Sequence, residues 1–120
     1  MSYDFYKILH VTGILIAFVA LGALILAAIQ KQGKQFVGKK FAGISHGIGL
    51  TFALVGGFGL AAKMHVPIST GWVSAKLIIW VILGGIIALI YRKQEWAKPI
   101  SVFIIILGAL AVYFARYKPF

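Results

Sequence analysis

The sequence predicts an all-α integral membrane protein, a single domain built as an antiparallel bundle of four transmembrane helices. Hydrophobic residues make up 62% of the 120 residues, against about 45–50% in an average soluble domain. A soluble chain this short cannot enclose so much apolar surface in one core. The excess falls into four blocks with short polar breaks, which predict spans 6–29, 41–62, 72–91 and 97–117 within the domain 1–120.

Each block has the length that a transmembrane helix needs. About 20 residues cross ~30 Å of hydrocarbon at ~1.5 Å per residue, and lipid leaves the backbone to satisfy its own hydrogen bonds. The first block continues to Ile29, beyond the ~7–15 apolar residues of a signal peptide, so it is interpreted as a retained span. The fourth has a shorter apolar part, 100–114, and Pro99 suits the first turn of its helix.

Small residues recur along one face of each block, and close backbone approach is how helices associate in lipid. These stripes are expected to face inward, and three of them include an ionisable side chain. Their members are His10, Gly13, Ala17 and Ala20; His46, Gly49, Ala53 and Gly57; Lys76, Trp80, Gly84 and Ala88; and Gly108, Ala111 and Ala115.

The breaks are short enough to make neighbouring helices antiparallel. Basic residues predominate in the first and third breaks, which the positive-inside rule places in the cytoplasm. Both termini are then expected on the periplasmic side of a bacterial inner membrane. The seven basic residues concerned are Lys31, Lys34, Lys39, Lys40, Arg92, Lys93 and Lys98.

Composition excludes several function classes. The chain has no cysteine, so disulfides and thiol or Cys-ligated chemistry are absent. Its net charge of +10 comes from residues that flank apolar blocks, which favours anionic lipid headgroups of the bilayer over nucleic acid as the partner. The two acids, Asp4 and Glu95, lie outside the apolar blocks, so hydrolysis by paired carboxylates and proton pumping through carboxylates find no support.

Three basic residues, His10, His46 and Lys76, lie at least one turn inside the ends of the predicted spans. Each is a functional candidate because such groups are costly in lipid. His10 can ligate a metal or a haem iron through one ring nitrogen. Lys76 is expected at the same end of the bundle, where Trp72 and Arg116 complete a cluster that would hold an anionic group. The alternative is that His10 bonds to a neighbouring helix and Lys76 extends to the surface.

His46 is the second candidate metal ligand, at the opposite depth. The rise per residue separates it from His10 by roughly 15–20 Å, whereas the two axial ligands of one haem lie about 4 Å apart (twice an Fe–N distance). The two histidines of one chain therefore do not share a haem. Separate sites, or a symmetric pair in a dimer, stay open.

Three runs resemble a group of small four-span bacterial membrane proteins that includes the SirB-like proteins and the HemJ-type protoporphyrinogen oxidases. They are Tyr6–His10, Ser45–Leu50 continuing through Gly57–Leu60, and Gly71–Leu77, with a similar ending at Lys118–Phe120. The resemblance implies haem b as the cofactor, with His10 and Lys76 as functional residues. A shorter chain and a lysine-containing first break depart from the HemJ-type pattern.

Three functions follow as hypotheses. The first is a haem-binding protein of redox or tetrapyrrole chemistry, which as an enzyme would be a haem-dependent membrane oxidoreductase. The second is a non-catalytic accessory or scaffold subunit of a larger membrane complex. The third is a carrier of small anions or other small molecules that acts as a homo-oligomer, namely a dimer.

Overall fold

The computed structural model describes residues 2–30 and 37–118, and this part of the chain is helical with no strand. Lys31 and Lys34 of the predicted first break lie outside the described residues. The elements, in order, are α1 Tyr3–Ile29, α2 Lys39–Lys63, α3 Gly71–Arg92, the short 3₁₀ helix η2 Gln94–Trp96 and α4 Ala97–Tyr117. The predicted all-α fold with four helices is confirmed.

α1 begins three residues before its predicted span because a local cap extends it. The side chain of Ser2 accepts a hydrogen bond from the backbone N–H of Phe5 at 3.1 Å. Asp4 lies in the first turn, where a negative charge is favourable beside the exposed N–H groups. Capping residues, rather than hydrophobicity, therefore set this boundary.

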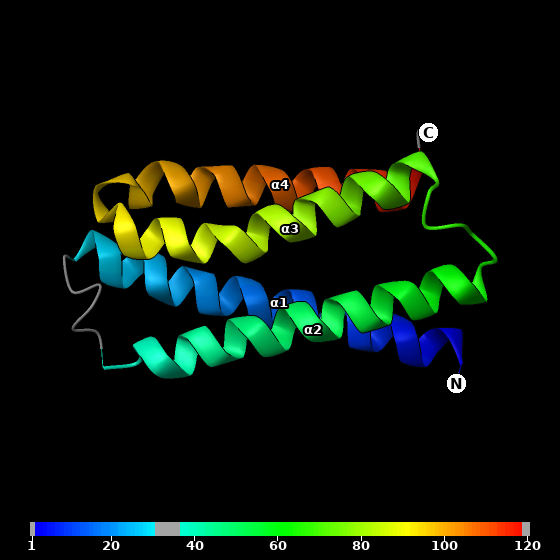
Figure 1. Ribbon diagram of the computed structural model, residues 1–120, viewed down its shortest axis with the longest axis horizontal. Helices are drawn as coiled ribbons and strands as arrows, with labels where there is room; N and C mark the ends of the chain where they lie inside the picture. The colour runs from blue at the N-terminus through cyan, green and yellow to red at the C-terminus, as the bar shows by residue number, and fades with distance from the viewer. Residues whose placement is uncertain (1, 31–36, 119–120) are drawn as a thin grey trace.

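The helices form two hairpins, α1–α2 and α3–α4, that lie against each other in an antiparallel bundle (Figure 1). The start of α1 and the end of α4 lie at the same end of the bundle (Figure 1). All four helices are long and apolar enough to span a membrane. By length and composition the chain is a multi-pass membrane protein.

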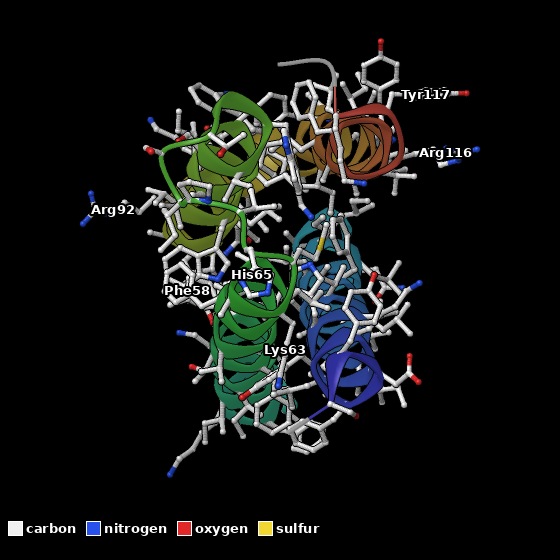
Figure 2. All side chains as sticks on the ribbon, turned by 90° about the vertical axis from the view of Figure 1, so that its right-hand side faces the viewer. Phe58, Lys63, His65, Arg92, Arg116 and Tyr117 are labelled. Atoms are coloured by element: carbon white, nitrogen blue, oxygen red, sulfur yellow. The ribbon has the colours of Figure 1, made fainter. Side chains whose placement is uncertain are left out.

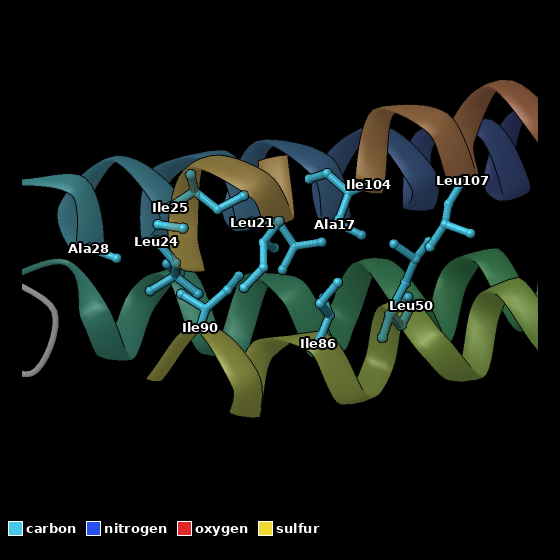
Figure 3. Packing of buried hydrophobic residues seen from close by; sticks show 14 of the residues in the cluster. Ala17, Leu21, Leu24, Ile25, Ala28, Leu50, Ile86, Ile90, Ile104 and Leu107 are labelled. Atoms are coloured by element: carbon cyan, nitrogen blue, oxygen red, sulfur yellow. The ribbon is translucent and has the colours of Figure 1, made fainter. Parts of the chain in front are cut away.

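The hydrophobic core between the hairpins lies toward the end remote from the termini (Figure 3). α1 contributes a buried face that includes Leu21 and Leu24, and α4 contributes Ile100 and Ile104. Toward the termini the hairpins diverge (Figure 1), and residues 71–77 of α3 are only half-buried. The polar residues of α1 and α3 therefore lie where apolar packing between the hairpins is least complete.

The buried face of α3 differs from the predicted stripe. Its fully buried residues are the branched side chains Ile79, Leu83, Ile86 and Ile90, and Ala88 is exposed. Gly84 and Trp80 instead face α2, where Gly84 lies near the side chain of Leu50. α3 thus packs against its neighbours through two faces, and the predicted stripe covers only the face that meets α2.

α1 and α2 contact each other through a glycine seam, defined as Gly13 and Ala17 of α1 with Gly49, Ala53 and Gly56 of α2. A Cβ built on Gly13 would lie 2.5 Å from the backbone oxygen of Gly49. A Cβ on Gly49 would lie 2.6 Å from the backbone oxygen of Gly13. The two backbones are thus in direct contact, which confirms that the small residues of these two helices face inward.

α2 ends in a Schellman motif whose left-handed residue is His65, at a φ of 57°. The N–H of Val66 bonds to the carbonyl of Ala61, and the N–H of His65 bonds to that of Ala62. A left-handed conformation costs a residue with a side chain about 1–2 kcal/mol, whereas glycine adopts it freely. We expect His65→Gly to raise the free energy of unfolding by about 0.5–1 kcal/mol, measured by denaturant titration in detergent.

His65→Ala is the control, because alanine keeps the steric cost of the left-handed conformation. It should leave the stability close to that of the native chain. A glycine variant less stable than the alanine variant would contradict this account of the turn.

Candidate functional site

His10 is positioned by the glycine seam, on the face of α1 that meets α2. Its Nδ1 lies 2.7 Å from the backbone oxygen of Ala53. A Cβ on Gly56 would lie 2.5 Å from the backbone nitrogen of His10, and one on Gly57 would lie 3.3 Å from its ring. Two glycines of α2 therefore leave the space that the His10 backbone and imidazole occupy.

The bond to Ala53 fixes which ring nitrogen of His10 carries a proton. A carbonyl oxygen can only accept, so Nδ1 must be the donor. In the neutral imidazole the other nitrogen, Nε2, then keeps its lone pair. Histidines that bind metals are commonly held in this way, with the second ring nitrogen donating to a carbonyl.

Lys76 and Trp72 lie with His10 at the termini end, as the sequence predicts. Lys76 lies within electrostatic range of His10. The Lys76 ammonium is 6.0 Å from the centre of the Trp72 ring, inside the distance at which a cation is attracted to an indole face. Residues from α1 and from the first turns of α3 therefore form one half-buried group.

Lys118 joins this group, although the sequence predicted no site role for it. Its Nζ lies 5.3 Å from the Trp72 ring centre and donates to the carbonyl of Ala115 at 3.0 Å. Its backbone is left-handed, with a φ of 49°, and caps α4. In an antiparallel bundle of four helices, the fourth helix ends where the third begins. A lysine directly after the fourth helix is therefore expected near Lys76, and this position could have identified Lys118 from the sequence. His10, Trp72, Lys76 and Lys118 are called the basic cluster below.

Arg116 is placed away from the basic cluster. It is exposed, and its guanidinium lies 5.5 Å from the centre of the Tyr117 ring. Both side chains point away from the bundle in the view along its axis (Figure 2). The structure thus brings three of the predicted residues together and leaves Arg116 on the surface.

The basic cluster has no carboxylate to balance it within the described residues. The charged side chain that acts on Lys76 is another cation, Lys118. Glu95 lies at the opposite end, in η2. Asp4 is exposed in the first turn of α1 and lies about 120° around that helix from His10. Lys76 is half-buried and Lys118 is exposed, and two neighbouring cations without an acid are suited to an anionic ligand.

His46 lies elsewhere, between α2 and α3, where it is only 3% exposed. Its Nε2 lies 3.1 Å from the backbone oxygen of Leu83. In the reverse direction, the indole N–H of Trp80 on α3 donates to the backbone oxygen of Leu50 on α2 at 2.9 Å. These two bonds, called the α2–α3 clamp below, join the hairpins through one polar side chain from each helix.

His10 and His46 lie at different depths in the bundle, as the contacts of His10 with α2 show. His10 lies against Ala53, Gly56 and Gly57, which follow His46 by seven to eleven residues, or roughly 10–16 Å along the helix. In residues 2–30 and 37–118, no three or more His, Cys, Asp or Glu side chains are grouped to hold a metal ion.

Comparison with models of protein families, with curated proteins and with solved structures finds no match to this chain.

Proposed function

We propose that this protein binds haem b at the basic cluster, with His10 as the axial ligand through Nε2. The observation that carries the proposal is the 2.7 Å contact between His10 Nδ1 and the carbonyl of Ala53. It leaves Nε2 with a free lone pair, on a side chain whose charged neighbour is Lys76. An imidazole nitrogen is a common protein ligand of haem iron.

The other members of the basic cluster suit the propionates and the apolar ring of haem b. The propionates of haem b are anionic, and Lys76 and Lys118 supply two ammonium groups near the Trp72 indole. Trp72 offers an aromatic face for contact with an apolar ring system. When bound, haem supplies one-electron chemistry at its iron. The chain's own residues bind the group, orient it and place it near one surface of the membrane.

His46 is not part of this proposal. Its imidazole is enclosed between two helices and is committed to the Leu83 carbonyl. We assign it a packing role in the α2–α3 clamp. One haem per chain, bound at the termini end, is the expected stoichiometry.

The test is the visible absorption spectrum of the protein purified from haem-replete cells, before and after reduction with dithionite. The native chain should show a Soret band at about one haem per chain, and His10→Ala should reduce it at least tenfold. Gly56 and Ala53 are unchanged in this variant, so the glycine seam is retained.

His65→Ala is the matched control, because it removes an exposed histidine at the same end of the bundle. Its Soret band should equal that of the native chain. A colourless native preparation would contradict the proposal, as would an undiminished band in a folded His10→Ala variant, with folding judged by its far-UV circular dichroism.

A further inference from the structure

A second feature lies at the opposite end of the bundle, between α3, η2 and α4. A groove of about 350 Å³ runs between these helices, which is within the ~300–1,000 Å³ range of pockets that hold small ligands. Its lining is apolar except at Trp96, and comprises Ile86, Leu89, Trp96, Pro99, Ile100 and Phe103. From Trp96 to Phe103 the groove extends roughly 10 Å into the depth of the bilayer.

The mouth of this groove carries a positive charge. The Lys93 ammonium lies 5.7 Å from the centre of the Trp96 ring, and Trp96 is itself a wall of the groove. The indole therefore holds the cation at the point where the apolar walls end. Tryptophan is typical of the membrane interface, and lysine just outside it attracts anionic lipid headgroups. Trp96 and Lys93 are arranged in this way.

The nearest acid does not face this mouth. Glu95 lines a separate hollow of about 520 Å³, together with Ala28 and Ile29 at the end of α1. Lys98 lines the same hollow as Glu95. The groove thus combines apolar walls with a cation that no residue of its own lining neutralises.

We propose that this groove is a binding site for one anionic phospholipid, with an acyl chain along α3 and α4 and the phosphate at Lys93. Charge complementarity selects this occupant, because a cation at the mouth and apolar walls behind it match an amphiphile with a negative head. The site is independent of the basic cluster, which lies at the other end of the bundle.

The experiment is native mass spectrometry of the protein in detergent after incubation with mixed micelles of equal phosphatidylglycerol and phosphatidylcholine. The native chain should retain phosphatidylglycerol at least fivefold over phosphatidylcholine. Lys93→Gln should reduce this preference to below twofold. Arg92→Gln is the matched control, because it removes one charge at the adjacent position while its side chain points away from the bundle (Figure 2).

A second variant tests the groove itself. Leu89→Trp places a large ring between the walls and should reduce retention of both lipids at least fivefold. Equal retention of the two lipids by the native chain would overturn the proposal, as would equal losses in Lys93→Gln and Arg92→Gln. A native species with the mass of two chains in place of chain plus lipid would also overturn it, because a second copy would then fill the groove.

Discussion

Replacing Gly13 or Gly49 by alanine is expected to separate α1 from α2. The added methyl carbon would lie 2.5–2.6 Å from backbone atoms of the facing helix, and backbone atoms cannot rotate away as a side chain can. Overpacking costs ~1–3 kcal/mol, occasionally more, and a clash with backbone belongs at the upper end. We therefore expect each variant to lose about 3 kcal/mol of unfolding free energy, measured by denaturant titration in detergent.

Gly22→Ala and Gly85→Ala are the matched controls. Both glycines are helical and exposed, and a Cβ at either position meets nothing within 4 Å. Alanine exceeds glycine in helix propensity by about 1 kcal/mol, so these variants should be unchanged or slightly more stable. Equal effects at Gly13 and Gly22 would show that the seam does not hold the hairpin together.

The seam also connects packing to the candidate site. A Cβ on Gly56 would meet the backbone of His10, so a larger residue there must displace the imidazole from the Ala53 carbonyl. The geometry that fixes Nε2 of His10 therefore depends on a glycine of another helix. A residue without a functional group, Gly56, therefore helps to set the geometry of the candidate site.

His46→Ala is expected to weaken the contact between the hairpins without removing haem. It creates a cavity where the imidazole is 3% exposed and deletes one bond of the α2–α3 clamp. Cavity formation and the lost bond together are expected to cost about 2–3 kcal/mol of unfolding free energy. The Soret band should persist, because the proposed ligand is His10, roughly 10–16 Å away along α2.

The measurements are denaturant titration and absorption of the same preparation. Trp80→Phe is the companion variant, since it deletes the other bond of the clamp while keeping an aromatic ring, and should cost only about 0.6–1 kcal/mol. A His46→Ala variant that is fully stable yet colourless would assign the ligand role to His46 instead.

The sequence by itself determined the number of helices, their bounds to within a few residues and their antiparallel order. The bounds predicted for the fourth helix coincide with those of α4, Ala97–Tyr117. These features could be predicted because they depend only on lengths along the chain. The thickness of the hydrocarbon sets the length of an apolar run, and short breaks leave only one direction for the next helix.

The sequence also placed Lys76 and Trp72 at the same end as His10, because helix order and residue count fix depth in a bilayer. Depth alone assigned Arg116 to the same group. The structure instead places Lys118 beside Trp72, because two residues of offset turn a side chain to another face of the helix end.

The tertiary structure alone decided which neighbour each helix face contacts. Gly49 and His46 share one stripe in the sequence, yet Gly49 meets α1 while His46 meets α3. Periodicity describes a single helix, and a helix in a bundle has two or more neighbours that divide its buried surface. The choice of partner comes from the fit between backbones and side chains of different helices, which no single helix encodes.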